Sequence, residues 1–139
     1  MVYLAAPSPS DIIMVAATKF AGPSHARFYS DWLDLPSYRN LHPPARALLL
    51  ETMARYRPKT STQFEWSSRK AAGLLLCSRS TAAQALHELV ECGWLKVERV
   101  GRTKGPRATR PSVYSLTMFG TAMDPTPSRE FMTWRPVAQ

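Results

Sequence analysis

Residues 67–116 read SSRKAAGLLLCSRSTAAQALHELVECGWLKVERVGRTKGPRATRPSVYSL, and their pattern decides the fold. Two short segments of helical character meet at Cys77 and Ser78. An apolar segment, a basic loop with Gly and Pro, and a second apolar segment follow them. Helices repeat every three to four residues and strands every second residue, so this order predicts two helices and then a β-hairpin.

Two serines predict where the two helices start. Ser67 is placed to cap a helix that runs to about Leu75, and Ser78 is placed to cap the next one, because a serine hydroxyl accepts a bond from a first-turn backbone N–H. Gly93 ends the second helix, since glycine tolerates the left-handed C-terminal conformation. Apolar residues in this helix have the spacing of one buried face. They are Ala82, Ala85, Leu86, Leu89 and Val90.

The segment after Gly93 has the period-two pattern of a β-hairpin. One strand starts at Trp94, and Val113–Thr117 is the returning strand. The loop between them contains no Asp or Glu, and we expect it to be exposed because connecting segments run over the surface. Its basic residues are Arg99, Arg102, Lys104, Arg107 and Arg110.

A helix upstream of this region is predicted to start at Pro43 and to end by Pro58, because proline is favoured in a first helical turn and disfavoured inside a helix. The helix carries two apolar stripes, so we expect it to be buried on two sides. The stripes consist of Ala45, Leu48, Leu49, Met53 and Tyr56, and of Ala47, Leu50 and Ala54. Gln63–Trp66 alternates as a short edge strand would.

The flanking segments also hold apolar residues. From Phe28 to Leu41 such residues recur at spacings of three or four, which predicts one or two helical turns packed against the core. Phe131 and Trp134 are spaced to pack back on the domain.

A chain of 139 residues has room for one domain. We expect an N-terminal arm at 1–27, a domain at 28–117 and a C-terminal extension at 118–139.

The positive charge is confined to one part of the chain. Residues 44–117 contain 13 Lys and Arg against 5 Asp and Glu, which accounts for the whole net charge of +8. Residues 1–43 and 118–139 are each balanced. A localised positive field favours a polyanionic partner, because contacts to phosphates release condensed counterions.

Neither an enzyme nor a metal site is indicated by the remaining residues. His25, His42 and His87 lack the short spacing of zinc ligands. Cys77 and Cys92 do not form a CxxC pair, so we expect two buried thiols in a reducing cytoplasm. The hairpin loop lacks the Gly-Lys-Ser/Thr ending of a phosphate-binding loop. We therefore expect no catalytic residue, no metal and no cofactor.

The sequence resembles bacterial winged helix-turn-helix proteins. Three motifs carry the resemblance, which covers about residues 28–117: SSRKAA (67–72), SRSTAAQALHEL (78–89) and CGWL (92–95). The sequence looks most like small helix-turn-helix proteins of proteobacterial genomes and of their phage or plasmid elements, including DNA-binding domains of replication initiators. The resemblance implies an α+β, mainly α fold, with a three-helix core and a small antiparallel β-hairpin wing. It also implies binding to duplex DNA.

The resemblance implies that the helix starting at Ser78 is the recognition helix, which enters the DNA groove. Glutamine can bond adenine and serine can approach either base edge, so groove contacts are favoured for Ser80 and Gln84. The basic residues of the wing would contact backbone phosphates or the minor groove. The candidate DNA-binding residues are Ser78, Arg79, Ser80, Thr81, Ala83, Gln84, His87, Arg99, Arg102, Lys104, Arg107 and Arg110.

Leu76 departs from the family pattern, which usually has glycine at the turn between the two helices. A residue other than glycine in the left-handed region costs about 1–2 kcal/mol. Either the turn is rebuilt here, or Leu76 buries enough apolar surface to offset this cost.

We expect sequence-specific binding of double-stranded DNA by a transcriptional regulator. Origin binding or mobile-element maintenance is an alternative within DNA binding, and a winged helix used as a protein-interaction module is the alternative from another class. The basic wing and the polar helix face favour DNA. The N-terminal arm or the first helix is the candidate homodimer contact. The apolar stretch Ile12–Ala17 is too short to span a membrane, so we expect a cytoplasmic, nucleoid-associated protein.

Overall fold

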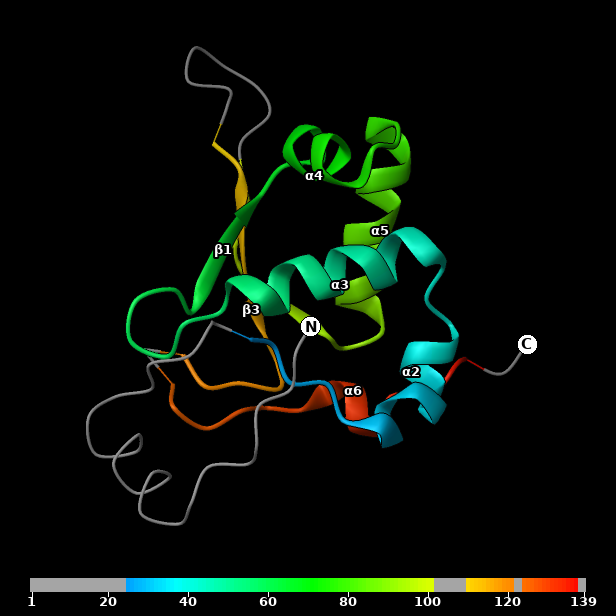
Figure 1. Ribbon diagram of the computed structural model, residues 1–139, viewed down its shortest axis with the longest axis vertical. Coiled ribbons are helices and arrows are strands. Elements are labelled where there is room, and N and C mark those ends of the chain that lie inside the picture. Colours follow the sequence, from blue (N-terminus) through cyan, green and yellow to red (C-terminus); the bar gives the residue numbers. More distant parts are fainter. Residues whose placement is uncertain (1–24, 102–109, 122–123, 138–139) are drawn as a thin grey trace, which may run out of the picture.

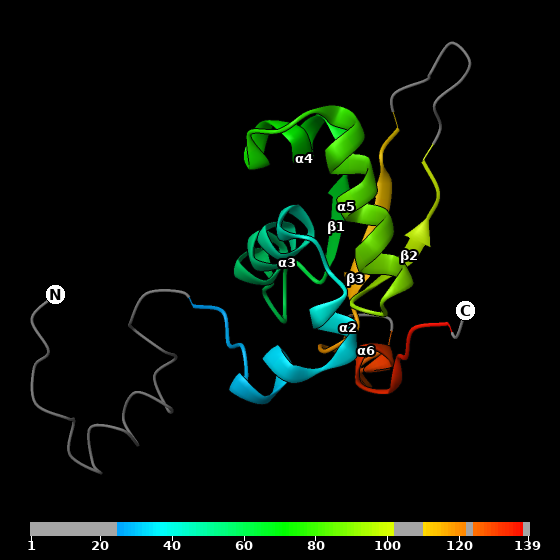
Figure 2. The ribbon, with the colours of Figure 1, turned by 90° about the vertical axis from the view of Figure 1, so that its right-hand side faces the viewer.

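The structure is a computed structural model that describes residues 25–101, 110–121 and 124–137. In this part of the chain, short helices and a three-stranded antiparallel sheet form an α+β fold, which confirms the predicted class (Figures 1 and 2). Most of the predicted N-terminal arm, and Arg102, Lys104 and Arg107, lie outside the described residues. The elements are η1 (Ser30–Asp34), α2 (Pro36–Arg39), α3 (Pro43–Arg55), β1 (Gln63–Trp66), α4 (Ser68–Leu75), α5 (Arg79–Glu91), β2 (Leu95–Arg99), β3 (Ser112–Leu116) and α6 (Glu130–Thr133).

The two serine caps are confirmed. The Ser67 hydroxyl accepts a hydrogen bond of 3.0 Å from the backbone N–H of Lys70. The Ser78 hydroxyl accepts one of 3.2 Å from the backbone N–H of Thr81. Gly93 follows α5 with a φ of +86°, in the left-handed region predicted for it. The starts of α4 and α5, and the stop after α5, are therefore local properties of the sequence.

The predicted hairpin forms, and a third strand joins it. The strand order is β1-β3-β2 with both pairs antiparallel, so β1 is the edge strand that the alternation of residues 63–66 predicts. The register places Trp66 opposite Ser112, and Val97 opposite Tyr114. The sheet therefore brings the last residue of β1, two positions before α4, beside the loop end of β3.

Helix α3 is buried on one side, so the prediction of two buried stripes is wrong. Ala45, Leu48, Leu49 and Met53 are buried, whereas Ala47, Leu50 and Ala54 are exposed, Leu50 to 62%. The reason is that α4 and α5 pack against the first stripe alone, and no other element of the described chain covers the second.

The turn between α4 and α5 contradicts both explanations offered for Leu76. The residue keeps the left-handed conformation, with φ 56° and ψ 48°, so the turn is not rebuilt. Its side chain is 92% exposed, so apolar burial does not offset the strain. The left-handed turn therefore forms without glycine, at a local cost that apolar burial does not offset.

Three aromatic side chains from distant segments meet at one end of the core. The ring of Phe131, from α6, stacks on that of Trp94 with a centroid distance of 4.2 Å, and Trp32, from η1, meets both rings edge-on. The indole N–H of Trp94 donates to the backbone carbonyl of Ser37 at 3.1 Å. We call Trp32, Trp94 and Phe131 the aromatic cluster. All three are buried.

The two cysteines differ in their surroundings. Cys92 is buried as predicted, and burial, with smaller contributions from nearby Glu91 and Glu88, raises its pKa to about 11. Cys77, in the α4–α5 turn, is only half-buried, because the turn lies at the surface.

No helix in the described part of the chain is long and apolar enough to cross a bilayer.

Figures 1 and 2 show how these parts are arranged. Helix α4 and the ends of the hairpin strands next to residues 102–109 lie at one end of the molecule, and η1, α2 and α6 lie at the other. Helix α5 runs between the two ends. Its first turn and its last turn therefore have different neighbours.

Candidate nucleic-acid interface

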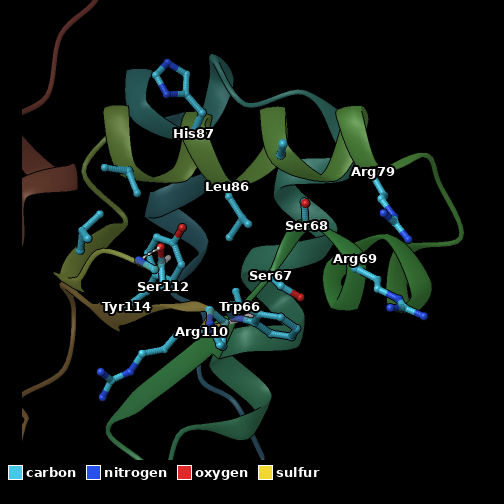
Figure 3. Close-up of a pocket in the computed structure, with 15 residues that line it drawn as sticks. Trp66, Ser67, Ser68, Arg69, Arg79, Leu86, His87, Arg110, Ser112 and Tyr114 are labelled. Carbon is cyan, nitrogen blue, oxygen red and sulfur yellow. Dashed lines mark hydrogen bonds between the residues drawn. The ribbon is translucent and has the colours of Figure 1, made fainter. Parts of the chain in front are cut away.

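An open groove of about 810 Å³ lies between α5, the first turn of α4 and the hairpin strands (Figure 3). Leu86 projects into it from α5, and Trp66 and Tyr114 form the sheet side. Arg69 and Arg79 extend from the first turns of α4 and α5 at one end of the groove. Arg110 lies on the opposite side, at the loop end of the hairpin. We call this hollow the groove.

The groove is positively charged. Among the described residues that line it there are three arginines and His87, and no Asp or Glu. Arg69, Arg79 and Arg110 are exposed, and none of them makes an ion pair with a carboxylate of the described residues. The N-termini of α4 and α5 add partial positive charge. An anion entering the groove would meet three unneutralised guanidinium groups.

The predicted residues of α5 divide into three groups. Arg79, Ala83 and His87 line the groove. Ser80 and Gln84 are exposed on the side of α5 that points away from the core, next to the groove lining. Ser78 and Thr81 serve the helix start, since the Ser78 hydroxyl also donates to the Thr81 hydroxyl at 2.9 Å. The polar face of α5 is therefore carried by Ser80, Gln84 and His87.

The two acidic residues near the end of α5 point in different directions. The carboxylate of Glu88 accepts a hydrogen bond of 2.9 Å from the backbone N–H of His42, and the same oxygen lies 2.9 Å from His42 Nδ1. His42 precedes α3, so this carboxylate sits at the positive end of that helix, away from the groove. Glu91 remains on the exposed face, where its carboxylate lies 3.0 Å from His87 Nε2.

Of the predicted wing residues, two are described. Arg110 lines the groove. Arg99 does not line it: its guanidinium lies 3.9 Å from the carboxylate of Glu65, and both residues pair in register with Val113. Arg99 and Glu65 therefore meet across the central strand.

Several groove residues were not predicted. Arg69 follows the capping serine by two positions, which places it in the first turn of α4, so the sequence did contain a signal for it. Trp66 and Tyr114 had no such signal. They enter the groove because the sheet register sets β1 and β3 side by side beneath α5.

Comparisons with known proteins identify no relative. No protein-family model matches the chain, and no curated protein matches it. One solved structure, described as "N-Terminal domain of DNA binding protein", is similar over 82% of this chain and 83% of that chain, with 14% sequence identity and a TM-score of 0.40. A likeness this weak assigns neither a fold nor a function.

Proposed function

We propose that this chain is a winged helix-turn-helix protein that binds double-stranded DNA sequence-specifically, without catalysis, and acts as a transcriptional regulator. The observation that carries the proposal is the groove: three arginines stand beside the exposed polar face of α5, and none of them has a carboxylate partner among the described residues. Residues 28–117 are the proposed binding unit, with α3, α4 and α5 as its helices and β2–β3 as the base of the wing.

The dimensions of α5 suit a major groove. An α-helix with its side chains is about 10–12 Å across, and the major groove of B-DNA is about 12 Å wide. The 13 residues of α5 span about 20 Å along the helix axis. In helix-turn-helix docking the N-terminal half of the recognition helix reads base edges. Ser80 and Gln84 occupy that half, and the Gln84 amide can bond adenine through both of its groups. Glu91 lies in the last turn, where its charge would be farthest from the bases.

Phosphate contacts are proposed for the groove arginines. Arg69 and Arg79 stand at one end of the groove and Arg110 at the other, so the two DNA strands that border the major groove could each meet a guanidinium. Such contacts fix the register of the protein on the duplex and carry no base preference. The net charge of +8 between residues 44 and 117 supports the same partner.

A salt-dependent binding titration tests this proposal. Selection from random oligonucleotides would first give the preferred duplex, and a palindromic site would indicate a homodimer. Wild-type binding should weaken linearly on a log–log plot as salt rises. Gln84→Ala should cost about 1–3 kcal/mol on the selected duplex and little on a scrambled one.

Arg79→Gln should behave differently from Gln84→Ala. It should weaken binding to both duplexes and make the salt slope shallower by about one. Lys96→Gln, which removes a charge from β2 outside the groove, is the matched control and should change neither quantity by as much. No binding even at low salt would exclude DNA as the partner and favour a protein-interaction module. An unchanged preference in Gln84→Ala would exclude Gln84 as a base contact, and an unchanged preference in the double variant Ser80→Ala, Gln84→Ala would exclude α5 as the reader.

A further inference from the structure

A second basic hollow lies outside the groove. It has a volume of about 480 Å³ and is bounded by the C-terminal end of α3, strand β1 and Lys70 of α4. All four residues of β1 line it. Successive side chains of a strand point to opposite faces, so a hollow that touches four in a row runs along the edge of the strand. This is the edge of β1 that faces away from β3.

The cations of this second hollow are held in place. Lys70 Nζ lies 5.3 Å from the ring centroid of Trp66, and the Arg55 guanidinium carbon lies 5.9 Å from it. One nitrogen of Arg57 donates to the backbone carbonyls of Ala54, at 2.9 Å, and Tyr56, at 2.7 Å. Cation–π contacts and fixed hydrogen bonds restrict these side chains, so less conformational entropy is lost when an anion binds.

The hollow keeps a positive charge after its carboxylates are counted. Arg55 forms an ion pair with Glu51. Glu65 lines the hollow, but its carboxylate lies near Arg99. Within the described residues, Arg57 and Lys70 have no carboxylate partner. Two cations therefore remain available to an external anion.

The first turn of α4 connects the second hollow to the groove. Arg69 lines the groove and the next residue, Lys70, lines the hollow, while Trp66 lines both. Each DNA strand carries a phosphate about every 3.4 Å along the helix axis. A strand that leaves the groove over this turn would therefore meet the second hollow within a few nucleotides.

We infer that the hollow formed by Arg55, Arg57 and Lys70 binds a backbone phosphate of the same duplex, beyond the base pairs read by α5. This inference rests on the proposed function. A phosphodiester suits the hollow better than an acidic peptide, because the cations continue from those of the groove without a break. The protein then contacts a longer segment of DNA on the α4 side than the recognition helix alone requires.

Lys70→Gln tests the inference, with Lys59→Gln as its matched control. Lys59 is exposed in the neighbouring loop and does not line the hollow. Loss of one phosphate contact should make the salt slope shallower by about 0.9. Between 50 and 200 mM salt, the factor by which affinity falls should therefore be about threefold smaller for the variant than for the wild type. The ratio of selected to scrambled binding should stay constant. Lys70→Arg should restore the slope, and Lys70→Gln should lower the melting temperature only slightly, through the lost contact with the Trp66 ring.

Duplex length locates the contact. Trimming base pairs from the end on the α4 side should abolish the difference between the wild type and Lys70→Gln, whereas trimming the other end should leave it. Equal slopes for Lys70→Gln and Lys59→Gln, or a difference that survives trimming at both ends, would overturn this inference while leaving the proposed function intact. A wild-type protein that binds no DNA would overturn both.

Discussion

The two ends of α5 lie in opposite surroundings. Its first turn opens on the groove, where Arg69 and Arg79 are exposed and have no carboxylate partner among the described residues. Its last turn leads through Gly93 into the aromatic cluster, where Trp94 and Phe131 are buried and stacked. The first turn is polar and accessible, and the segment that follows the last turn is apolar and closed.

This difference separates binding from stability within one helix. The aromatic cluster joins three segments that are far apart in the sequence, and it holds the last turn of α5 in place. The first turn can then present uncompensated charge, which destabilises a folded protein only modestly when it is exposed to water. We expect substitutions in the aromatic cluster to change stability, and substitutions in the groove to change DNA binding.

The largest effect is expected for Phe131→Ala. Removing a fully buried aromatic ring should lower the free energy of unfolding by about 3–5 kcal/mol, through lost burial and the cavity left behind. Denaturant unfolding measures this directly. The neighbouring Met132→Ala is the control, because its side chain is 42% exposed and its loss should cost far less. A salt slope for DNA binding that changed in the folded Phe131→Ala protein would contradict the separation.

Gly93→Ala should have the next largest effect. A Cβ atom at this position would lie 2.8 Å from two backbone atoms, the carbonyl carbon of Glu130 and the nitrogen of Phe131, and the φ of +86° disfavours alanine. We expect a loss of at least about 2 kcal/mol, measured by thermal or denaturant unfolding.

The matched control for this glycine is Gly73→Ala, in α4. A Cβ there would meet no atom within 4 Å, so helix propensity should stabilise the protein by about 0.5–1 kcal/mol. If Gly93→Ala and Gly73→Ala changed the stability in the same direction, the loss in Gly93→Ala could not be attributed to the contact between the end of α5 and α6.

The smallest effect is expected for Leu76→Gly. Glycine relieves the left-handed strain at φ 56°, worth about 1–2 kcal/mol, but increases the freedom of the unfolded chain by a similar amount. The net change should be a stabilisation of at most about 1 kcal/mol, measured by thermal melting. Leu76→Ala keeps the strain and should differ little from the wild type. A clear loss of stability in Leu76→Gly would show that the exposed leucine has a contact in the folded protein.

Much of the fold was predictable because its signals are local. Ser67 and Ser78 each bond a backbone N–H three residues away, Gly93 adopts its own favoured conformation, and the hairpin strands show their alternation directly. Part of the groove followed from the same signals, since the residues of the first turns of α4 and α5 could be placed once the helix starts were known. These interactions involve neighbours in the chain, so sequence spacing is sufficient to locate them.

The sequence by itself therefore determined α3, α4, α5 and the hairpin strands to within a few residues, the concentration of charge between residues 44 and 117, and the polar face of α5. Tertiary structure alone decided which of these residues meet. Trp66 and Tyr114 lie beneath α5, and the carboxylate of Glu88 contacts His42. The guanidinium of Arg99 lies near Glu65, and the second stripe of α3 is exposed. Each of these contacts joins residues separated by many positions, and it depends on strand register and helix packing, which no local periodicity encodes.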